Sequence, residues 1–237
     1  MVNEMKELEI DTASPPGFRA PMESSDATTL RLLRAKGISH IVTDSGASES
    51  RLPVISPGPV AANGEPLVLL PRTLSGPEDL MADTTAPEAI KNYLTELDLA
   101  ADMGALGVVS LPTRSSLSPA QWGEILARLK ARDKQVWLST ANQVSSWWRE
   151  HERVQVSLNT DVSPALLTLQ ISGEGPLQQA MTLLVNLPQS GRVPLLFANG
   201  HDAPAPKVAS YDNLRAALIL PNLAPGKYEW YLSFTAP

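Results

Sequence analysis

The chain has 237 residues, of which 43% are apolar, so it can build a substantial core in one large domain or two ordinary ones. Its net charge of −6 excludes a general affinity for nucleic-acid phosphates, which needs clustered Lys and Arg. The absence of cysteine excludes disulfides, thiolate metal sites and thiol catalysis. No apolar run reaches the roughly 18 residues that span a bilayer, so we expect no transmembrane segment.

Helical and strand patterns alternate through the first part of the chain. Met1–Ile10 is typical of a charged helix and not of a secretory leader. Further helices are predicted at 26–36, 88–103, 119–132 and 140–151, and strands at 38–43, 67–70, 106–111 and 135–138. Strict alternation of this kind favours parallel strands with helices outside. The predicted fold is α/β, a partial (β/α) barrel, with an open doubly wound sheet as the alternative.

The pattern changes after about residue 153. Short apolar runs separated by Pro, Gly and Asn predict strands at 154–160, 166–171, 181–187, 194–198, 208–211, 216–220 and 228–234. Strands of this number and spacing are typical of an all-β, immunoglobulin-like sandwich. We therefore expect two domains, residues 1–153 and 154–237.

One short motif carries most of the functional information, the segment Gly17-Phe18-Arg19-Ala20-Pro21. An arginine at the carboxyl end of a parallel strand points into the rim where barrel enzymes keep their sites. Pro21 stiffens the loop and moves Ala20 away from helical angles. The alternative is a surface arginine in an ordinary loop.

The order of the surrounding elements carries a resemblance. A helix, Gly37 and a buried strand follow the motif, and the runs 68–72, 136–137 and 147–149 come later in a fitting order. The stretch 4–153 resembles the polysaccharide deacetylases with the NodB homology fold, and the motif is similar to the third motif of that family.

The resemblance implies a function and a set of site residues. Members of the family use a divalent metal such as zinc to remove N- or O-acetyl groups from polysaccharides. The resemblance also implies a periplasmic or cell-envelope location. By resemblance, Arg19 binds the catalytic-base aspartate, Pro21 helps to shape the groove, and Leu111 lines the acetyl pocket. We expect a polysaccharide or another glycan as the partner.

The departures from the family pattern are as informative as the resemblance. The family's aspartate pair and histidine pair lie upstream of the motif, where this chain has only 16 residues, so a missing N-terminal segment is expected. Pro112 stands where the family has its catalytic histidine. His40, His151 and His201 do not have metal-ligand spacing. The sequence therefore predicts no cofactor in this chain and no deacetylase activity for the chain alone. The alternative is a non-catalytic glycan-binding or envelope interaction protein.

Other polar and aromatic groups leave two interpretations open. Asp44 with its neighbouring hydroxyls at a strand end fits either a site or an Asx-type turn. Asp79 and Asp83 fit a solvated acidic face better than a metal site. The tryptophans at 122, 137, 147 and 148 fit domain packing, or stacking on the apolar face of a sugar ring. The β-rich part likewise fits either a packing module or a glycan-binding module.

Overall fold

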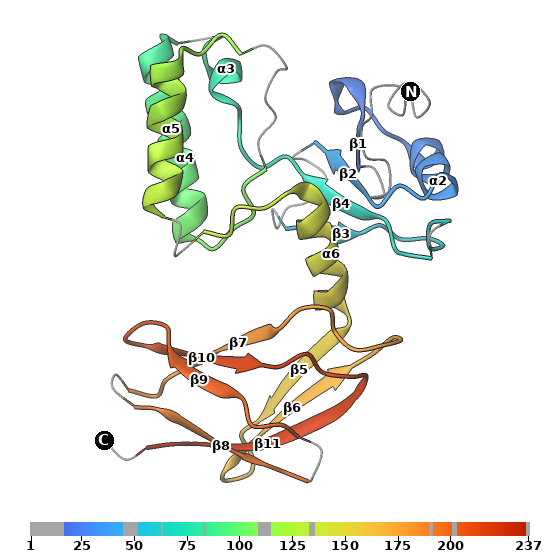
Figure 1. Cartoon of the computed structure of the whole chain (residues 1–237), viewed down its shortest axis with the longest axis vertical. Coiled ribbons are helices and arrows are strands. Elements are labelled where there is room, and N and C mark those ends of the chain that lie inside the picture. Colours follow the sequence, from blue (N-terminus) through green and yellow to red (C-terminus); the bar gives the residue numbers. More distant parts are fainter. Residues whose placement is uncertain are drawn as a thin grey trace. The chain divides into compact units, whose positions relative to one another are not determined.

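The computed structural model in Figure 1 describes residues 17–44, 52–62, 64–82, 84–108, 115–132, 136–189, 192–200 and 203–235. The chain divides into two compact units, Met1–Trp148 and Arg149–Pro237.

The first unit contains a small mixed sheet in the order β1-β2-β4-β3. Its strands are β1 (Gly17–Arg19), β2 (His40–Thr43), β3 (Val54–Ile55) and β4 (Val68–Pro71). β1, β2 and β4 are parallel, whereas β3 runs antiparallel to β4. The carboxyl ends of the three parallel strands therefore meet at one edge of the sheet.

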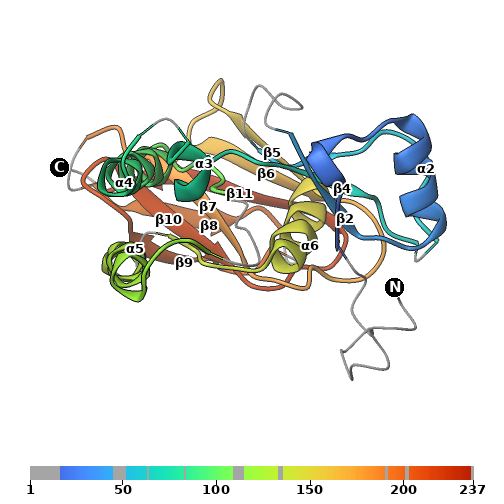
Figure 2. The ribbon, with the colours of Figure 1, turned by 90° about the horizontal axis from the view of Figure 1, so that it is seen from above.

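Helix α2 (Ala27–Ala35) covers one face of this sheet, and Figure 2 shows α6 (Ala141–Glu152) on the other side. Leu33 of α2 packs with Ile41 and Leu67, which are almost completely buried. The helix begins at Asp26, whose carboxylate accepts a hydrogen bond from the backbone N–H of Thr29 at 2.7 Å. The predicted helix over 26–36 is confirmed.

A buried arginine at the end of α2 holds β3 in place. The Arg34 guanidinium donates to the carbonyl oxygen of Pro57 at 2.7 Å and to the Ser56 hydroxyl. A Cβ on Gly58 would lie 3.2 Å from the centre of that guanidinium, so the loop passes directly over it. These contacts fix the segment that follows β3 and keep β3 against the outer edge of β4.

The remaining helices form a second cluster in the same unit. They are α3 (Pro77–Leu80), α4 (Ala86–Asp102) and α5 (Pro119–Ala131). α5 begins with a capping box, in which the side chains of Ser118 and Gln121 accept hydrogen bonds from each other's backbone N–H groups. The buried core of this cluster is made of Leu74, Ile90, Tyr93, Leu117 and Ile125.

The fold class predicted from the sequence, a partial (β/α) barrel of the NodB type followed by an all-β sandwich, is wrong. None of the three sheets of the described residues closes, and the chain is a mixed α/β structure rich in sheet. The antiparallel β3 occupies the edge of β4 where a further parallel strand would have to add. In addition, 106–108 and 136–138, two segments of predicted strands, lie outside any sheet.

The second unit contains two antiparallel sheets, in the orders β5-β6-β11-β8 and β7-β10-β9. The strands are β5 (Val154–Asn159), β6 (Ala165–Ile171), β7 (Met181–Asn186), β8 (Pro194–Ala198), β9 (Lys207–Ser210), β10 (Arg215–Leu220) and β11 (Gly226–Phe234). All seven strands predicted in this part of the sequence are present, with bounds that differ by at most two residues.

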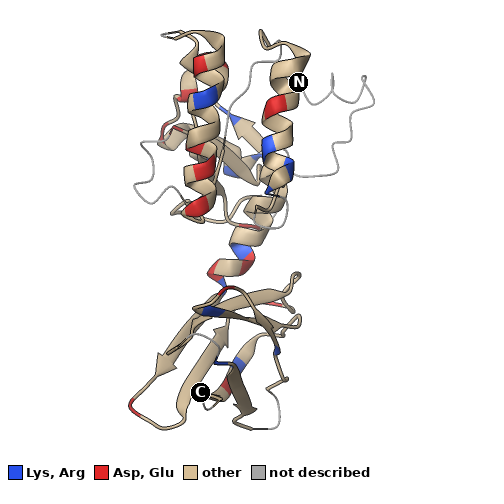
Figure 3. Cartoon of the chain, turned by 90° about the vertical axis from the view of Figure 1, so that its left-hand side faces the viewer, with Lys and Arg blue, Asp and Glu red and all other residues tan. Residues whose placement is uncertain are grey.

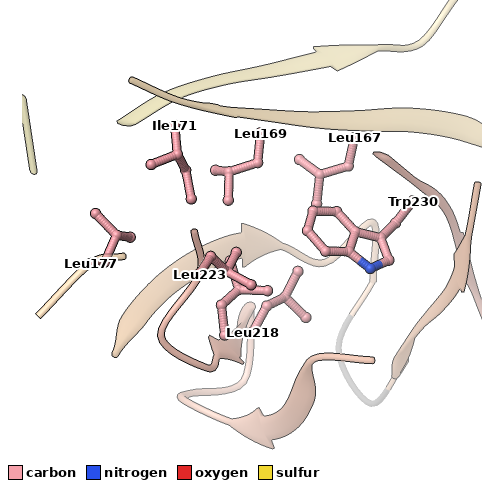
Figure 4. Close-up of a cluster of buried hydrophobic side chains, with 8 residues drawn as sticks. Leu167, Leu169, Ile171, Leu177, Leu218, Leu223 and Trp230 are labelled. Atoms are coloured by element: carbon pink, nitrogen blue, oxygen red, sulfur yellow. The ribbon is translucent and has the colours of Figure 1, made fainter. Parts of the chain in front are cut away.

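One buried cluster joins the two sheets of this unit (Figure 4). Leu167 and Leu169 come from β6, Leu218 from β10 and Trp230 from β11. The Trp230 ring is 1% exposed, and its indole N–H donates to the carbonyl oxygen of Pro204 at 3.0 Å. The one polar atom of this large side chain is therefore satisfied inside the core.

In the described part of the chain, no helix combines the length and the apolar character that crossing a membrane requires.

Helices α4 and α5 are tied together by an ion network on their exposed sides. Arg128 is hydrogen-bonded to Asp98 through both Nε and Nη2, and Arg132 Nε lies 2.9 Å from the same carboxylate. Arg132 also reaches Asp102 at 2.8 Å. The hydrogen bonds from Arg128 are the main cause that lowers the pKa of Asp98 below its ordinary value of 3.8.

We predict that Asp98→Asn destabilises the protein at neutral pH and flattens its response to acid. Because the pKa of Asp98 is lower in the folded state, its stabilising contribution is complete above about pH 4 and is lost as the pH falls through the lowered value. Thermal unfolding from pH 7 down to pH 2.5 measures this. Glu124→Gln, which removes an exposed carboxylate of α5, is the control. Equal acid slopes for the wild type and Asp98→Asn would contradict the prediction.

Candidate functional site

The Gly17–Pro21 motif lies at the carboxyl ends of the parallel strands, where it joins a chain of charged side chains. Arg19, the last residue of β1, donates to Oε1 of Glu23 at 2.9 Å. Nε of Arg72, which follows β4, lies 2.7 Å from the same oxygen. Arg72 also reaches Asp79 at 3.2 Å. Two strand ends are thus joined through one shared carboxylate.

Burial differs along this chain of charges. The side chain of Glu23 is 10% exposed, that of Arg72 is 26% exposed, and those of Arg19 and Asp79 are about half exposed. The Arg72 Nε–H is not directed at Glu23 for a hydrogen bond, and Nε has no hydrogen-bond partner in the described structure. The 2.7 Å contact of Arg72 Nε with Glu23 is therefore an ion pair without hydrogen-bond alignment.

A strained turn places the Glu23 carboxylate between the two arginines. Met22 and Glu23 have φ angles of 54° and 56°, in the left-handed region that residues with a Cβ rarely adopt. Pro21 begins the turn, and Ala20 before it is extended, as the sequence predicts. The Met22 side chain is 96% exposed and contributes no packing in return for the strain. The turn thus directs the acidic side chain inward and the apolar one outward.

The glycine of the motif is explained by a neighbouring histidine. Gly17 pairs with His40 across β1 and β2, and a Cβ on Gly17 would lie 2.1 Å from Nε2 of the imidazole. The His40 side chain is buried, and its Nδ1 lies 2.8 Å from the Ser39 hydroxyl. Only glycine allows β1 to approach β2 this closely.

A buried hydroxyl lies at the end of the central strand. Thr43, the last residue of β2, is 6% exposed, and its Oγ1 has no hydrogen-bond partner in the described residues. Its backbone carbonyl accepts a hydrogen bond from the N–H of Arg72 at 2.9 Å. In the described residues, this edge of the sheet therefore contains two buried polar atoms without a hydrogen bond, Thr43 Oγ1 and Arg72 Nε, of which Arg72 Nε is in an ion pair with Glu23.

The structure places several other sequence candidates apart from this edge or outside its description. Leu111, Pro112, Asp83 and His201 lie outside the described residues. His151 lies near the end of α6, with Nδ1 at 3.5 Å from Glu152. Within the described ranges, no group of three or more His, Asp or Glu side chains could hold a metal ion.

The aromatic side chains form a cluster in the first unit. The rings of Trp137 and Trp147 meet edge to face at 6.3 Å, and those of Trp147 and Trp148 lie 5.9 Å apart. Trp137 is 56% exposed, whereas Trp122 packs against the α4–α5 core and donates its indole N–H to Ser115. One tryptophan of the cluster therefore offers a ring to solvent.

Sequence reasoning missed Glu23 as a partner of Arg19, and it missed Arg72 as the second arginine that contacts Glu23. Glu23 lies four residues after Arg19, a spacing that brings side chains together in a helix and was not expected to do so across a proline turn. Arg72 follows a predicted strand, and Arg19 is the last residue of β1. Charged residues at the carboxyl ends of successive parallel strands were thus a readable signal.

The arrangement can bind and orient polar ligands. Two guanidinium groups near a strand-end edge suit carbonyl, hydroxyl or carboxylate oxygens. Because Glu23 and Asp79 balance the two arginines, the cluster has no net formal charge. This favours uncharged polar ligands over strongly anionic ones.

No family model matches the sequence, and no curated protein and no solved structure matches it either. The resemblance to the polysaccharide deacetylases therefore stays a prediction from the sequence.

We predict that Gly17→Ala destabilises the first unit by about 1–3 kcal/mol, the usual cost of inserting an extra methyl group into a filled space. The reason is the collision of the new Cβ with the buried His40 imidazole. The free energy of unfolding measured in denaturant tests it. In a His40→Ala background the same substitution should cost much less. An equal cost in both backgrounds would show that the imidazole is not the obstacle.

Proposed function

We propose that this chain is a polysaccharide deacetylase-like protein that lacks the metal site and does not release acetyl groups by itself. In the parent reaction, a metal-bound water hydrolyses the amide or ester bond of an acetyl group on a polysaccharide. The observation that carries the proposal is the position of Arg19. It lies at the carboxyl end of a parallel strand, and the motif turn that follows contains Pro21.

The carboxylate partner of Arg19 supports the inactive part of the proposal. In the family that the motif resembles, this arginine binds the catalytic-base aspartate. Here Arg19 donates to Glu23, a carboxylate of the same turn, which Arg72 also binds. Both guanidinium groups thus hold a carboxylate of the turn itself, and we assign this contact to a structural pair and not to a catalytic base.

The open sheet supports the same conclusion. A closed barrel surrounds its substrate with strand ends on all sides. The described sheet offers only three parallel strand ends, because β3 covers the outer edge of β4. The sequence adds that Pro112, which cannot transfer a proton, stands at the position of the family's catalytic histidine.

We predict that the purified chain releases no acetate from chitin oligosaccharides or acetylated xylan above the blank, with or without added Zn²⁺ or Co²⁺. Hydrolysis needs a metal-activated water and a proton donor, and neither is assigned to a residue of this chain. A coupled acetate assay measures the outcome. Metal-dependent acetate release that is lost in Arg19→Ala would overturn the inactive reading and establish Arg19 as part of an active site.

A specific observation favours a second candidate, a non-catalytic glycan-binding protein. The Trp137 ring is 56% exposed and meets Trp147 edge to face at 6.3 Å. An exposed indole ring suits stacking on the C–H face of a pyranose ring. This role needs no metal and no proton donor.

We predict for this candidate that Trp137→Ala weakens retention of the chain on an affinity gel containing chitin or xylan by several-fold, because the stacking face is lost. Leu138→Ala is the matched control, since Leu138 is the neighbouring residue and its exposed fraction of 58% is close to that of Trp137. Equal loss in both variants would indicate general apolar adhesion. Unchanged retention in Trp137→Ala would remove this candidate site.

A further inference from the structure

A groove of about 350 Å³ in the second unit lies between the start of β8 and the β9–β10 hairpin. Its volume falls within the range of pockets that bind small ligands. Val193, Pro194 and Val208 supply apolar surface to the groove. The polar lining comes from Arg192, Ser210, Asp212, Asn213 and Arg215.

One of the two arginines in this groove is fully engaged. Arg215 Nη2 lies 2.7 Å from Oδ2 of Asp212. Its guanidinium also lies 4.8 Å from the centroid of the Tyr211 ring, a cation–π contact. Asp212 accepts a further hydrogen bond from the N–H of Leu214 at 2.8 Å. These contacts hold Arg215 and Asp212 as a compensated pair.

The other arginine is not compensated. Nε of Arg192 is buried and has no hydrogen-bond partner among the described residues, and no ion pair joins Arg192 to a carboxylate of the described ranges. A buried donor without a partner is unfavourable, and more so when the group is charged. Figure 3 shows few charged residues on the strands of this unit.

The neutral polar groups complete the chemistry of the groove. Ser210 and Asn213 place a hydroxyl and an amide beside the arginines. Hydroxyl and amide groups both donate and accept hydrogen bonds, which is what sugar hydroxyls require. The apolar part of the lining suits the C–H face of a sugar ring.

We propose that this groove binds a sugar unit that carries one carboxylate, a uronic acid residue. One uncompensated guanidinium calls for one anionic charge, and a planar carboxylate matches the two terminal nitrogens of Arg192 in two parallel hydrogen bonds. Phosphate, which carries nearly two charges at neutral pH, would exceed the single unpaired positive charge of the groove. The proposal rests on the second unit alone and is independent of the function proposed above.

The test is calorimetric titration of the full chain with sodium glucuronate, glucose, acetate and inorganic phosphate. We expect saturable binding of glucuronate. Glucose lacks the carboxylate and acetate lacks the ring, so both should bind at least about ten-fold more weakly, the effect expected from losing a charge-assisted hydrogen bond. Acetate or phosphate binding as tightly as glucuronate would overturn the assignment to a uronic acid. So would the absence of glucuronate binding.

Two variants locate the binding. Arg192→Gln should weaken glucuronate binding at least about ten-fold, because it removes the charge and the fork. Arg31→Gln, which changes an exposed arginine of α2 in the first unit, is the matched control and should bind as the wild type does. If Arg192→Gln is less stable, Asn213→Ala tests the same groove at an exposed turn residue. Unchanged binding in both groove variants would place the ligand elsewhere and overturn the proposal.

Discussion

A single carboxylate, that of Glu23, connects the strand ends of the first unit. Its Oε1 lies within 2.9 Å of both Arg19, the last residue of β1, and Arg72, which follows β4. Because these strands flank β2 in the sheet, the carboxylate bridges the two outer parallel strands at their carboxyl ends. The strained turn at Met22 and Glu23 is what brings it there. Strain of this kind persists only where the surrounding contacts over-determine it, and here the two guanidinium groups and the rigid Pro21 supply those contacts.

Sequence reasoning succeeded where local physics decides the structure. The helix over 119–132 was readable because its start depends on local residues, with Ser118 and Gln121 in a capping box and Pro119 in the first turn. The strands of the second unit were readable for a similar reason. Along β11, inward Trp230 and Leu232 alternate with outward Glu229 and Tyr231. This alternation in the sequence predicts which face of the strand is buried.

The same reasoning failed where a long-range contact decides. Nothing local in Val54–Ile55 indicates that this two-residue segment pairs antiparallel with β4. The pairing depends on Arg34, far away in sequence, whose guanidinium binds Pro57 and packs under Gly58. In a helical sequence pattern, an arginine is normally interpreted as an exposed charge. The sequence therefore did not indicate the Arg34 contacts that hold β3 at the edge of the sheet. Only part of the candidate site could be predicted, for the same reason. The motif indicated Arg19, but Glu23 reaches Arg19 only through an unusual turn.

Charge compensation separates the two kinds of arginine in this chain. In the second unit, Arg153 pairs with Glu150 at 3.0 Å and donates to backbone carbonyls, and Arg215 pairs with Asp212. The partners of these two arginines compensate for the solvation that the guanidinium groups lose on folding. We therefore interpret both arginines as structural. Arg192 lacks a carboxylate among the described residues, and one of its donors is buried. Arg34 likewise has no carboxylate partner in that part of the chain and has a buried Nε without a hydrogen bond, but its guanidinium donates to Ser56 and Pro57, which makes it structural. Arg192 has neither kind of side-chain partner among the described residues, and an anion that enters the groove would supply one.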